Sequence, residues 1–157
     1  MIRAIFLDID GVLTDGKMYI DGHGNVFKSL NYKDLDAITS FKQEGIIIGC
    51  ISGEDTAFSQ NLRKYVDFAE LGCKCKKEFI ENYCKKNNVD IDDILYVGDG
   101  KYDIDALKAV GMSVCPSDAI RVVQDIVDVV LETKGGSGCV SELYYYLQKQ
   151  ECLNDYT

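Results

Sequence analysis

The feature that most constrains this chain is the apolar run IFL at positions 5–7, which ends directly at the tetrapeptide DIDG at positions 8–11. An apolar run of that length, bounded by a turn signal, predicts a buried strand in a parallel sheet. Side chains alternate along a strand, so we expect Asp8 and Asp10 on one side, while Gly11 lets the chain turn away. Carboxylates at the carboxyl end of a central strand stand where open α/β sheets bind ligands.

The DIDG tetrapeptide permits two interpretations. Crowded carboxylates repel each other, so a cation or a shared proton has to offset this repulsion. A magnesium ion suits the position, because it binds one or two carboxylates together with water and phosphate oxygens. The alternative is a strand end that carries two solvated aspartates. The rest of the chain has to distinguish the two.

The composition is that of an ordinary globular protein. The 157 residues suffice for a substantial core, and we expect one domain over residues 1–157. A formal net charge of -9 disfavours nucleic acid and anionic membranes as partners, because both require a basic surface. The N-terminus lacks a signal-peptide pattern, and no apolar stretch approaches the roughly 20 residues that span a bilayer. We therefore expect a cytoplasmic protein whose seven scattered cysteines are reduced thiols.

Short apolar strands alternate with helical patterns along the chain. Further strands are predicted at 46–51, 68–71, 94–97, 112–115 and 126–131. Six helices are predicted. The first runs from an N-cap at Asp34 to Gly45, the second covers about 54–64, and the fifth covers about 117–124. The third follows the Lys-rich turn 74–77, the fourth follows the strand end at 98–100 and carries Asp103, and the sixth follows the glycine-rich break 135–138. The alternation predicts an α/β fold, a three-layer doubly wound parallel sheet with right-handed crossovers.

A β-hairpin is predicted early in the chain, over residues 17–30. The turn GHG at positions 22–24 separates its two limbs. A hairpin in an otherwise alternating chain is an insertion, here after the first strand, and no insertion large enough for a cap domain follows. We expect the hairpin to cover a site, to pair with another subunit, or both; the alternative is a plain surface ribbon.

Polar residues of a consistent kind follow four of the predicted strands. In a parallel sheet these strand ends share one edge, so the residues converge on one crevice. The set comprises Asp8 and Asp10 after the first strand, Ser52 and Gly53 after the second, Lys76 after the third, and Asp99 and Asp103 after the fourth.

This set suits phosphoryl transfer. We expect Asp8 to attack phosphorus and form an aspartyl-phosphate, and Asp10 to protonate the leaving oxygen and then deprotonate the attacking water. The hydroxyl of Ser52, the amide of Gly53 and the ammonium of Lys76 would stabilise charge on the phosphoryl oxygens.

The same acids predict a magnesium site. Asp99 would hold the ion together with Asp8 and the backbone carbonyl of Asp10, and Asp103 would orient these ligands. The ion would also relieve repulsion between the carboxylates and an incoming phosphate.

The sequence resembles the haloacid dehalogenase superfamily of phosphatases, whose four motifs are matched in order over nearly the whole chain. The matching segments are DIDG at 8–11, Ser52-Gly53, Lys76 and GDGKYD at 98–103. Within the superfamily the chain is most similar to the capless sugar-acid phosphatases, through DGVLTDG at 10–16, the hairpin to Leu30, NYKD at 31–34 and GGSG at 135–138. The resemblance implies a Mg²⁺-dependent phosphoric monoester hydrolase.

The subgroup hydrolyses 3-deoxy-D-manno-octulosonate 8-phosphate or the nonulosonate 9-phosphates related to sialic acid. The resemblance implies a homotetramer in which the hairpins assemble centrally and a neighbour's surface closes each site. The C-terminal tail, about 135–157, would then fold over a site; otherwise its glycines form only a linker before the last helix.

The resemblance also suggests substrate-binding residues. Glutamate after the Ser-Gly of the second motif is typical of the nonulosonate enzymes and arginine of the octulosonate enzymes, so Glu54 favours a nine-carbon acid. Alternatively, Glu54 only begins a helix, where the dipole favours an acid. Arg63 or Lys64 of a neighbouring subunit would meet the substrate carboxylate, and Thr14 and Lys33 lie in matched motifs as further candidates.

Two positions depart from the subgroup, and three rival functions stay open. Gly100 replaces the usual second aspartate, which would weaken magnesium binding, and Ser137 replaces a frequent charge in the tail. The rivals are a broader-specificity sugar phosphatase or phosphomutase, a receiver-like switch, and a noncatalytic partner of a sugar-acid cytidylyltransferase. A mutase needs a cap domain, and a receiver carries its phosphorylated aspartate on a middle strand, so these two are disfavoured.

Overall fold

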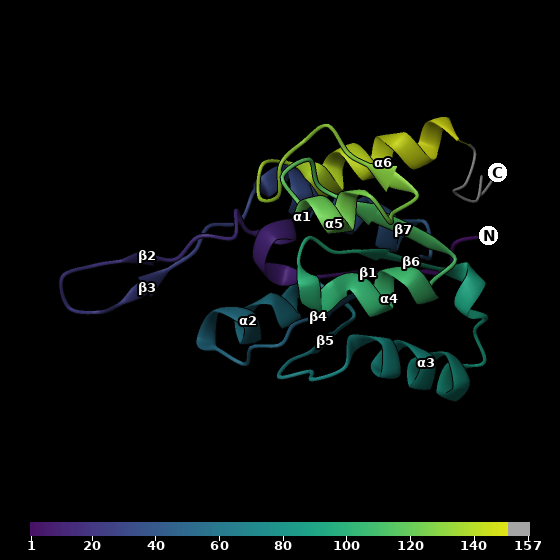
Figure 1. Cartoon of the computed structure of the whole chain (residues 1–157), viewed down its shortest axis with the longest axis horizontal. Coiled ribbons are helices and arrows are strands. Elements are labelled where there is room, and N and C mark those ends of the chain that lie inside the picture. The colour runs from purple at the N-terminus through teal and green to yellow at the C-terminus, as the bar shows by residue number, and fades with distance from the viewer. Residues whose placement is uncertain (151–157) are drawn as a thin grey trace.

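The computed structural model describes residues 1–150, which form one six-stranded parallel sheet and a separate two-stranded hairpin (Figure 1). The strand order is β5-β4-β1-β6-β7-β8, so the first strand lies in the interior of the sheet and pairs with β4 and β6. The strands are β1 (Ala4–Leu7), β4 (Ile47–Ile51), β5 (Phe68–Glu70), β6 (Ile94–Val97), β7 (Met112–Cys115) and β8 (Val129–Val130).

Side-chain alternation in β1 divides the core into two layers. Ile5 and Leu7 belong to one apolar cluster, and Ala4 and Phe6 belong to the other. Helices α1 (Tyr32–Gln43) and α6 (Cys139–Lys149) cover the first face, and α3 (Lys76–Asn87) and α4 (Ile104–Ala109) cover the second. The predicted three-layer α/β fold with a hairpin insertion is confirmed.

Two predicted helices are shorter than expected. The helix predicted over 54–64 begins only at α2 (Ala57–Asn61), because Thr56 and Ser59 form a capping box there, and it ends in a 3₁₀ turn, Leu62–Lys64. Glu54 therefore precedes the helix, and its interpretation as a helix-starting residue is wrong. The helix predicted over 117–124 is reduced to α5 (Arg121–Gln124).

The N-cap predicted at Asp34 is also wrong. Asn31 caps α1, and its side chain accepts a hydrogen bond from the Lys33 amide. Asp34 lies inside α1 and is buried, and its Oδ1 accepts from the amides of Val140 and Ser141 at 2.9 and 3.1 Å. The side chain thus caps the distant helix α6 instead of its own.

The hairpin projects from the body of the molecule (Figure 1). Its antiparallel strands are β2 (Tyr19–Ile20) and β3 (Val26–Phe27). A two-stranded ribbon buries little apolar surface of its own. Accordingly Met18 and the four strand residues are 49–64% exposed.

The glycine-rich segment 135–138 is packed against the first loop, so its interpretation as a flexible break is wrong. A Cβ atom at Gly135 would collide with the carbonyl oxygen of Gly11, and one at Gly136 with the backbone of Asp15. The close approach requires glycine at both positions. The chain then continues into α6, which packs on α1. The rest of the predicted tail, residues 151–157, lies outside the described part of the chain.

Six cysteines lie within residues 1–150, and all six are free thiols, as predicted. Cys152 falls outside that range. No helix in the described range is both long and apolar enough to cross a bilayer.

Candidate active site

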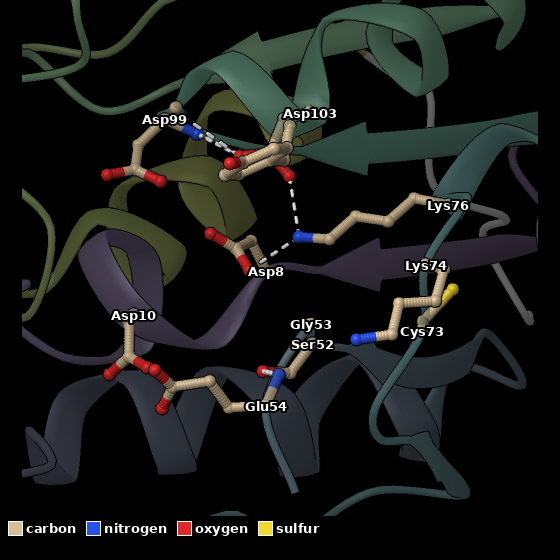
Figure 2. A pocket seen from close by; sticks show the side chains of 12 residues that line it. Asp8, Asp10, Ser52, Gly53, Glu54, Cys73, Lys74, Lys76, Asp99 and Asp103 are labelled. Atoms are coloured by element: carbon tan, nitrogen blue, oxygen red, sulfur yellow. Dashed lines mark hydrogen bonds and ion pairs between the residues drawn. The ribbon is translucent and has the colours of Figure 1, made fainter.

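A cavity of about 560 Å³ opens at the carboxyl ends of β1, β4 and β6. This edge, beside the first strand, is where the strand order reverses and where doubly wound sheets bind ligands. Its lining residues are Asp8, Asp10, Ser52, Gly53, Glu54, Cys73, Lys74, Lys76, Asp99, Gly100, Tyr102 and Asp103. All seven residues of the predicted constellation therefore meet in one pocket (Figure 2).

Lys76 links the first and fourth motifs at the base of this pocket. It begins α3, and its Nζ donates to Oδ1 of Asp8 and to Oδ1 of Asp103, both at 2.8 Å. Burial alone would lower the pKa of Lys76, but the two carboxylates outweigh it and the pKa is raised. The neighbouring Lys77 is half exposed and pairs with Glu81, so Lys76 is the lysine that faces the site.

Asp103 is saturated with hydrogen bonds. Its Oδ2 accepts from the amides of Asp99 and Gly100 at 3.0 Å, and its Oδ1 accepts from Lys76 and from the Tyr96 hydroxyl. A Cβ atom at Gly98 would overlap the Asp103 side chain. Asp103 therefore holds the loop after β6 in shape.

The carboxylates of Asp8, Asp99 and Asp103 form a cluster that fits a metal ion. One oxygen of each lies within 4.8 Å of the others. Burial raises the pKa of Asp99 to about 6 and raises that of Asp8 well above its ordinary value. The raised pKa values mean that the protein groups around Asp8 and Asp99 do not fully stabilise their ionised forms. A bound cation would do so, and carboxylate oxygens are the hard ligands that Mg²⁺ prefers.

Asp10 reaches the pocket by a different route from the one predicted. The strand ends at Leu7, and residues 9–13 form a turn whose backbone is non-helical at Asp10 and at Gly11, where φ is 91°, so strand alternation does not place the two carboxylates. Oδ1 of Asp10 accepts from the Thr14 hydroxyl at 3.1 Å, and both carboxylate oxygens accept from Lys28 Nζ at 2.9 Å.

Ser52 and Gly53 form the wall contributed by β4. The Ser52 Oγ accepts from the Glu54 amide at 3.1 Å, which leaves the hydroxyl proton free to be donated. The Gly53 amide lines the pocket and makes no hydrogen bond within residues 1–150. Both groups can therefore donate to an oxyanion held in the cavity.

The predicted substrate-binding residues are only partly brought together. Glu54 lines the pocket, with its side chain 62% exposed. Thr14 is fully buried, does not line the pocket of its own chain, and donates its hydroxyl to Asp10. Arg63 bonds to Gln60, and Lys33 lines a separate depression between α1 and α6; neither lines the active pocket of its own chain.

Comparison with known proteins assigns the family. The haloacid dehalogenase-like hydrolase family matches residues 50–143. A 3-deoxy-D-manno-octulosonate 8-phosphate phosphatase from Haemophilus influenzae is 32% identical over 149 residues, covering 90% of this chain and 80% of the relative. The chain belongs to the haloacid dehalogenase-like hydrolases. The predicted family and enzyme class, phosphoric monoester hydrolase, are thereby confirmed.

Solved structures of such hydrolases have the same fold. The cobalt-bound octulosonate phosphatase from Haemophilus influenzae has a TM-score of 0.87 and 31% identity, covering 96% of this chain and 90% of that one. The octulosonate phosphatase from Moraxella catarrhalis, determined with magnesium, phosphate and 3-deoxy-D-manno-octulosonate, has a TM-score of 0.89 at 23% identity, covering 94% and 86%.

Five residues of this hydrolase's site escaped the sequence reasoning. Cys73, Lys74 and Tyr102 line the pocket, and Lys28 and Tyr96 lie behind it. A tyrosine in the otherwise aliphatic strand β6 was a usable signal, because a buried hydroxyl needs a partner. Lys28 gave no such signal, because its partner lies 18 residues away in the sequence.

Proposed function

We propose that this hydrolase is a magnesium-dependent phosphatase that removes phosphate from a phosphorylated 2-keto-3-deoxy sugar acid. The observation that carries the proposal is that Asp8 lies within reach of Lys76 and of two further acids in the cavity at the carboxyl edge of the sheet. A nucleophile, a fixed cation and a metal-binding pair are the parts that phosphoryl transfer requires.

In the proposed reaction Asp8 attacks phosphorus and becomes an aspartyl-phosphate, while Asp10 protonates the oxygen of the leaving sugar acid. Asp10 then takes a proton from the water that hydrolyses the intermediate. The Ser52 hydroxyl, the Gly53 amide and the Lys76 ammonium donate to the phosphoryl oxygens, where charge spreads in the transition state.

Magnesium is the proposed cofactor, held by Asp8 and Asp99. It would supply Lewis-acid neutralisation of the phosphate and of the carboxylates around it. Asp103 has both oxygens engaged with protein donors and so orients the site. Support for a divalent cation comes from the three-carboxylate cluster and from the cobalt-bound Haemophilus relative.

The proposal leaves two candidate substrates, which differ in the number of carbon atoms in the sugar acid. The similar phosphatases act on an eight-carbon acid, whereas Glu54 in the second motif favours a nine-carbon acid. Magnesium-dependent phosphate release should be compared for octulosonate 8-phosphate, two nonulosonate 9-phosphates and simple hexose phosphates. Preference for the nine-carbon acid supports the role of Glu54, preference for the eight-carbon acid refutes it, and hexose phosphates turned over equally well indicate a broad-specificity enzyme.

The covalent mechanism makes a direct prediction for Asp8→Asn. We expect phosphate release to fall by more than about a thousandfold, because loss of a nucleophile leaves only binding and electrostatic contributions. Thermal unfolding should remain cooperative, because Asp103 still pairs with the Lys76 ammonium and the asparagine carbonyl oxygen can accept from it in place of the carboxylate. Asp105→Asn, on the exposed surface of α4, is the matched control. Near-wild-type turnover by Asp8→Asn would rule out the aspartyl-phosphate, and inactivity of the wild type on every substrate would favour a noncatalytic partner protein.

We further propose a homotetramer assembled through the hairpin. The support is its projecting shape and its exposed apolar side chains, which would otherwise remain in water (Figure 1). In such an assembly Arg63 and Lys33, which do not line their own pocket, remain candidates to contact substrate in a neighbour's site.

A further inference from the structure

Lys28 follows β3 at the base of the hairpin, and its ammonium is buried beside the active pocket. Its side chain is only 8% exposed. The Nζ donates to Oδ1 and Oδ2 of Asp10, both at 2.9 Å, and lies 3.6 Å from Oε2 of Glu54. The Phe58 ring, with its centroid 5.6 Å away, contacts the same ammonium. Lys28 does not line the cavity, so it lies behind the two carboxylates and not in the path of a substrate.

The position of Lys28 explains how two carboxylates come to lie together on one wall of the pocket. Figure 2 shows Asp10 and Glu54 with their carboxylates directed toward one another. Like charges in such proximity repel, and a shared cation between them replaces repulsion with attraction. The Lys28 side chain is only 8% exposed, so its attraction for the two carboxylates, which are 33% and 62% exposed, is screened less by water than that of a surface ion pair. Without Lys28 the two carboxylates would move apart.

The contacts of Asp10 leave one of its oxygens suited to proton transfer. Oδ1 accepts from both Thr14 and Lys28, whereas Oδ2 accepts from Lys28 alone within residues 1–150. A carboxylate oxygen can accept more than one hydrogen bond. Oδ2 therefore keeps more acceptor capacity than Oδ1, and its direction depends on the bond to Lys28.

We propose that Lys28 is the positioning residue for the general acid–base Asp10, and that it ties the orientation of Asp10 to the seating of the hairpin. This inference rests on the proposed phosphatase function. Proton transfer requires the acid to stand within hydrogen-bond reach of the leaving oxygen, and a displacement of about 1 Å costs on the order of a hundredfold in rate. Lys28 thus acts through the protonation of the leaving oxygen by Asp10 and makes no contact with the nucleophile Asp8.

Two substrates separate that role from a merely structural one. The leaving group of an alkyl phosphate such as octulosonate 8-phosphate is an alkoxide, which needs the proton from Asp10. The leaving group of p-nitrophenyl phosphate is a stable phenolate, which does not need it. The measurement is kcat/KM, because this ratio reports the steps up to release of the leaving group and is independent of the later hydrolysis. For Lys28→Met we expect kcat/KM to fall at least about tenfold further for the alkyl than for the aryl substrate. Lys28→Arg, which keeps a cation that binds carboxylates, should restore most of the difference.

Lys17→Met, at the exposed base of the opposite limb, is the matched control and should change neither value. Equal losses on both substrates after Lys28→Met would overturn the proposal, because they would show only that Lys28 anchors the hairpin. The proposal would also be overturned if Lys28→Arg did not selectively restore kcat/KM for the alkyl substrate. If Lys28→Met does not fold, the same ratio measured for Lys28→Gln against Lys28→Arg decides. Inactivity of the wild type on both substrates would instead refute the phosphatase function itself.

Discussion

Four aspartates of the active pocket differ in environment although their side chains are chemically identical. Asp103 has its acceptors filled by four donors, and Asp10 is held by Lys28 and Thr14. Asp8 and Asp99 are desolvated, with raised pKa values. In the proposed mechanism these differences correspond to separate tasks: Asp103 organises the loop, Asp10 transfers a proton, and Asp8 and Asp99 bind the cation.

At the residue scale, the pKa of about 6 at Asp99 predicts a pH-dependent effect of magnesium on stability. Between its ordinary value of 3.8 and about 6, this carboxyl is protonated in the native state and ionised in the unfolded state. Protonation of Asp99 therefore stabilises the metal-free folded state at low pH, and this stabilisation is lost as the pH rises through 6. Magnesium binds the ionised form, so it should raise the Tm more at pH 7.5 than at pH 5.

Thermal unfolding with and without magnesium at the two pH values tests this expectation. In Asp99→Asn we expect the Tm to be insensitive to magnesium at both pH values. An equal shift at pH 5 and pH 7.5 in the wild type would contradict a role for Asp99 as a ligand.

Elements in this protein are stabilised across long sequence distances. Gly138, which precedes α6, has no side chain to cap the helix, and Asp34 of α1 supplies the missing acceptor. The first amides of a helix have no intrahelical partners, so a buried helix start requires such a group. The pair joins α1 to α6 beneath the loop that carries Asp10.

At the element scale, Asp34→Ala should lower the free energy of unfolding by about 1–2 kcal/mol, because it leaves the buried Val140 amide and the partly buried Ser141 amide without this acceptor. Asp34→Asn keeps a carbonyl oxygen at the same place and should cost less. Chemical denaturation measures both, with Asp36→Ala, exposed on the same helix, as the control. A loss no greater than that of Asp36→Ala would contradict the capping role.

On the scale of the whole molecule, the hairpin is the element that the fold of one chain does not explain. The six-stranded sheet and its helices close around their own core, while the hairpin adds apolar surface that this core does not cover. The loop that descends from it carries Lys28 to Asp10. Assembly through the hairpin would therefore affect the position of Asp10 in the active pocket through Lys28.

The corresponding prediction concerns the double variant Ile20→Asp and Phe27→Asp. We expect the mass in solution, measured by light scattering, to fall from that of a tetramer to that of a monomer, since burying two unpaired charges per hairpin is unfavourable. His23→Asp, at the turn, should leave the mass unchanged. A wild type that is itself monomeric would refute the assembly proposal without affecting the catalytic one.

The parallel sheet and the converging motifs follow from local features of the amino-acid sequence. Short apolar runs that end in turn residues specify strands locally, and parallel strands bring their carboxyl ends to one edge whatever the details of packing. That argument sufficed to bring Asp8, Ser52, Lys76 and Asp99 into one pocket.

The hydrogen-bond partner of each polar side chain, in contrast, depends on how distant segments pack. Asp34 reads as a helix cap in the sequence, but it binds Val140, 106 residues away. Thr14 reads as a substrate contact, but packing buries it against Asp10, and Lys28 meets Asp10 only because the hairpin folds back. Local propensity depends on neighbours along the chain, whereas a hydrogen-bond partner depends on which distant segments pack together.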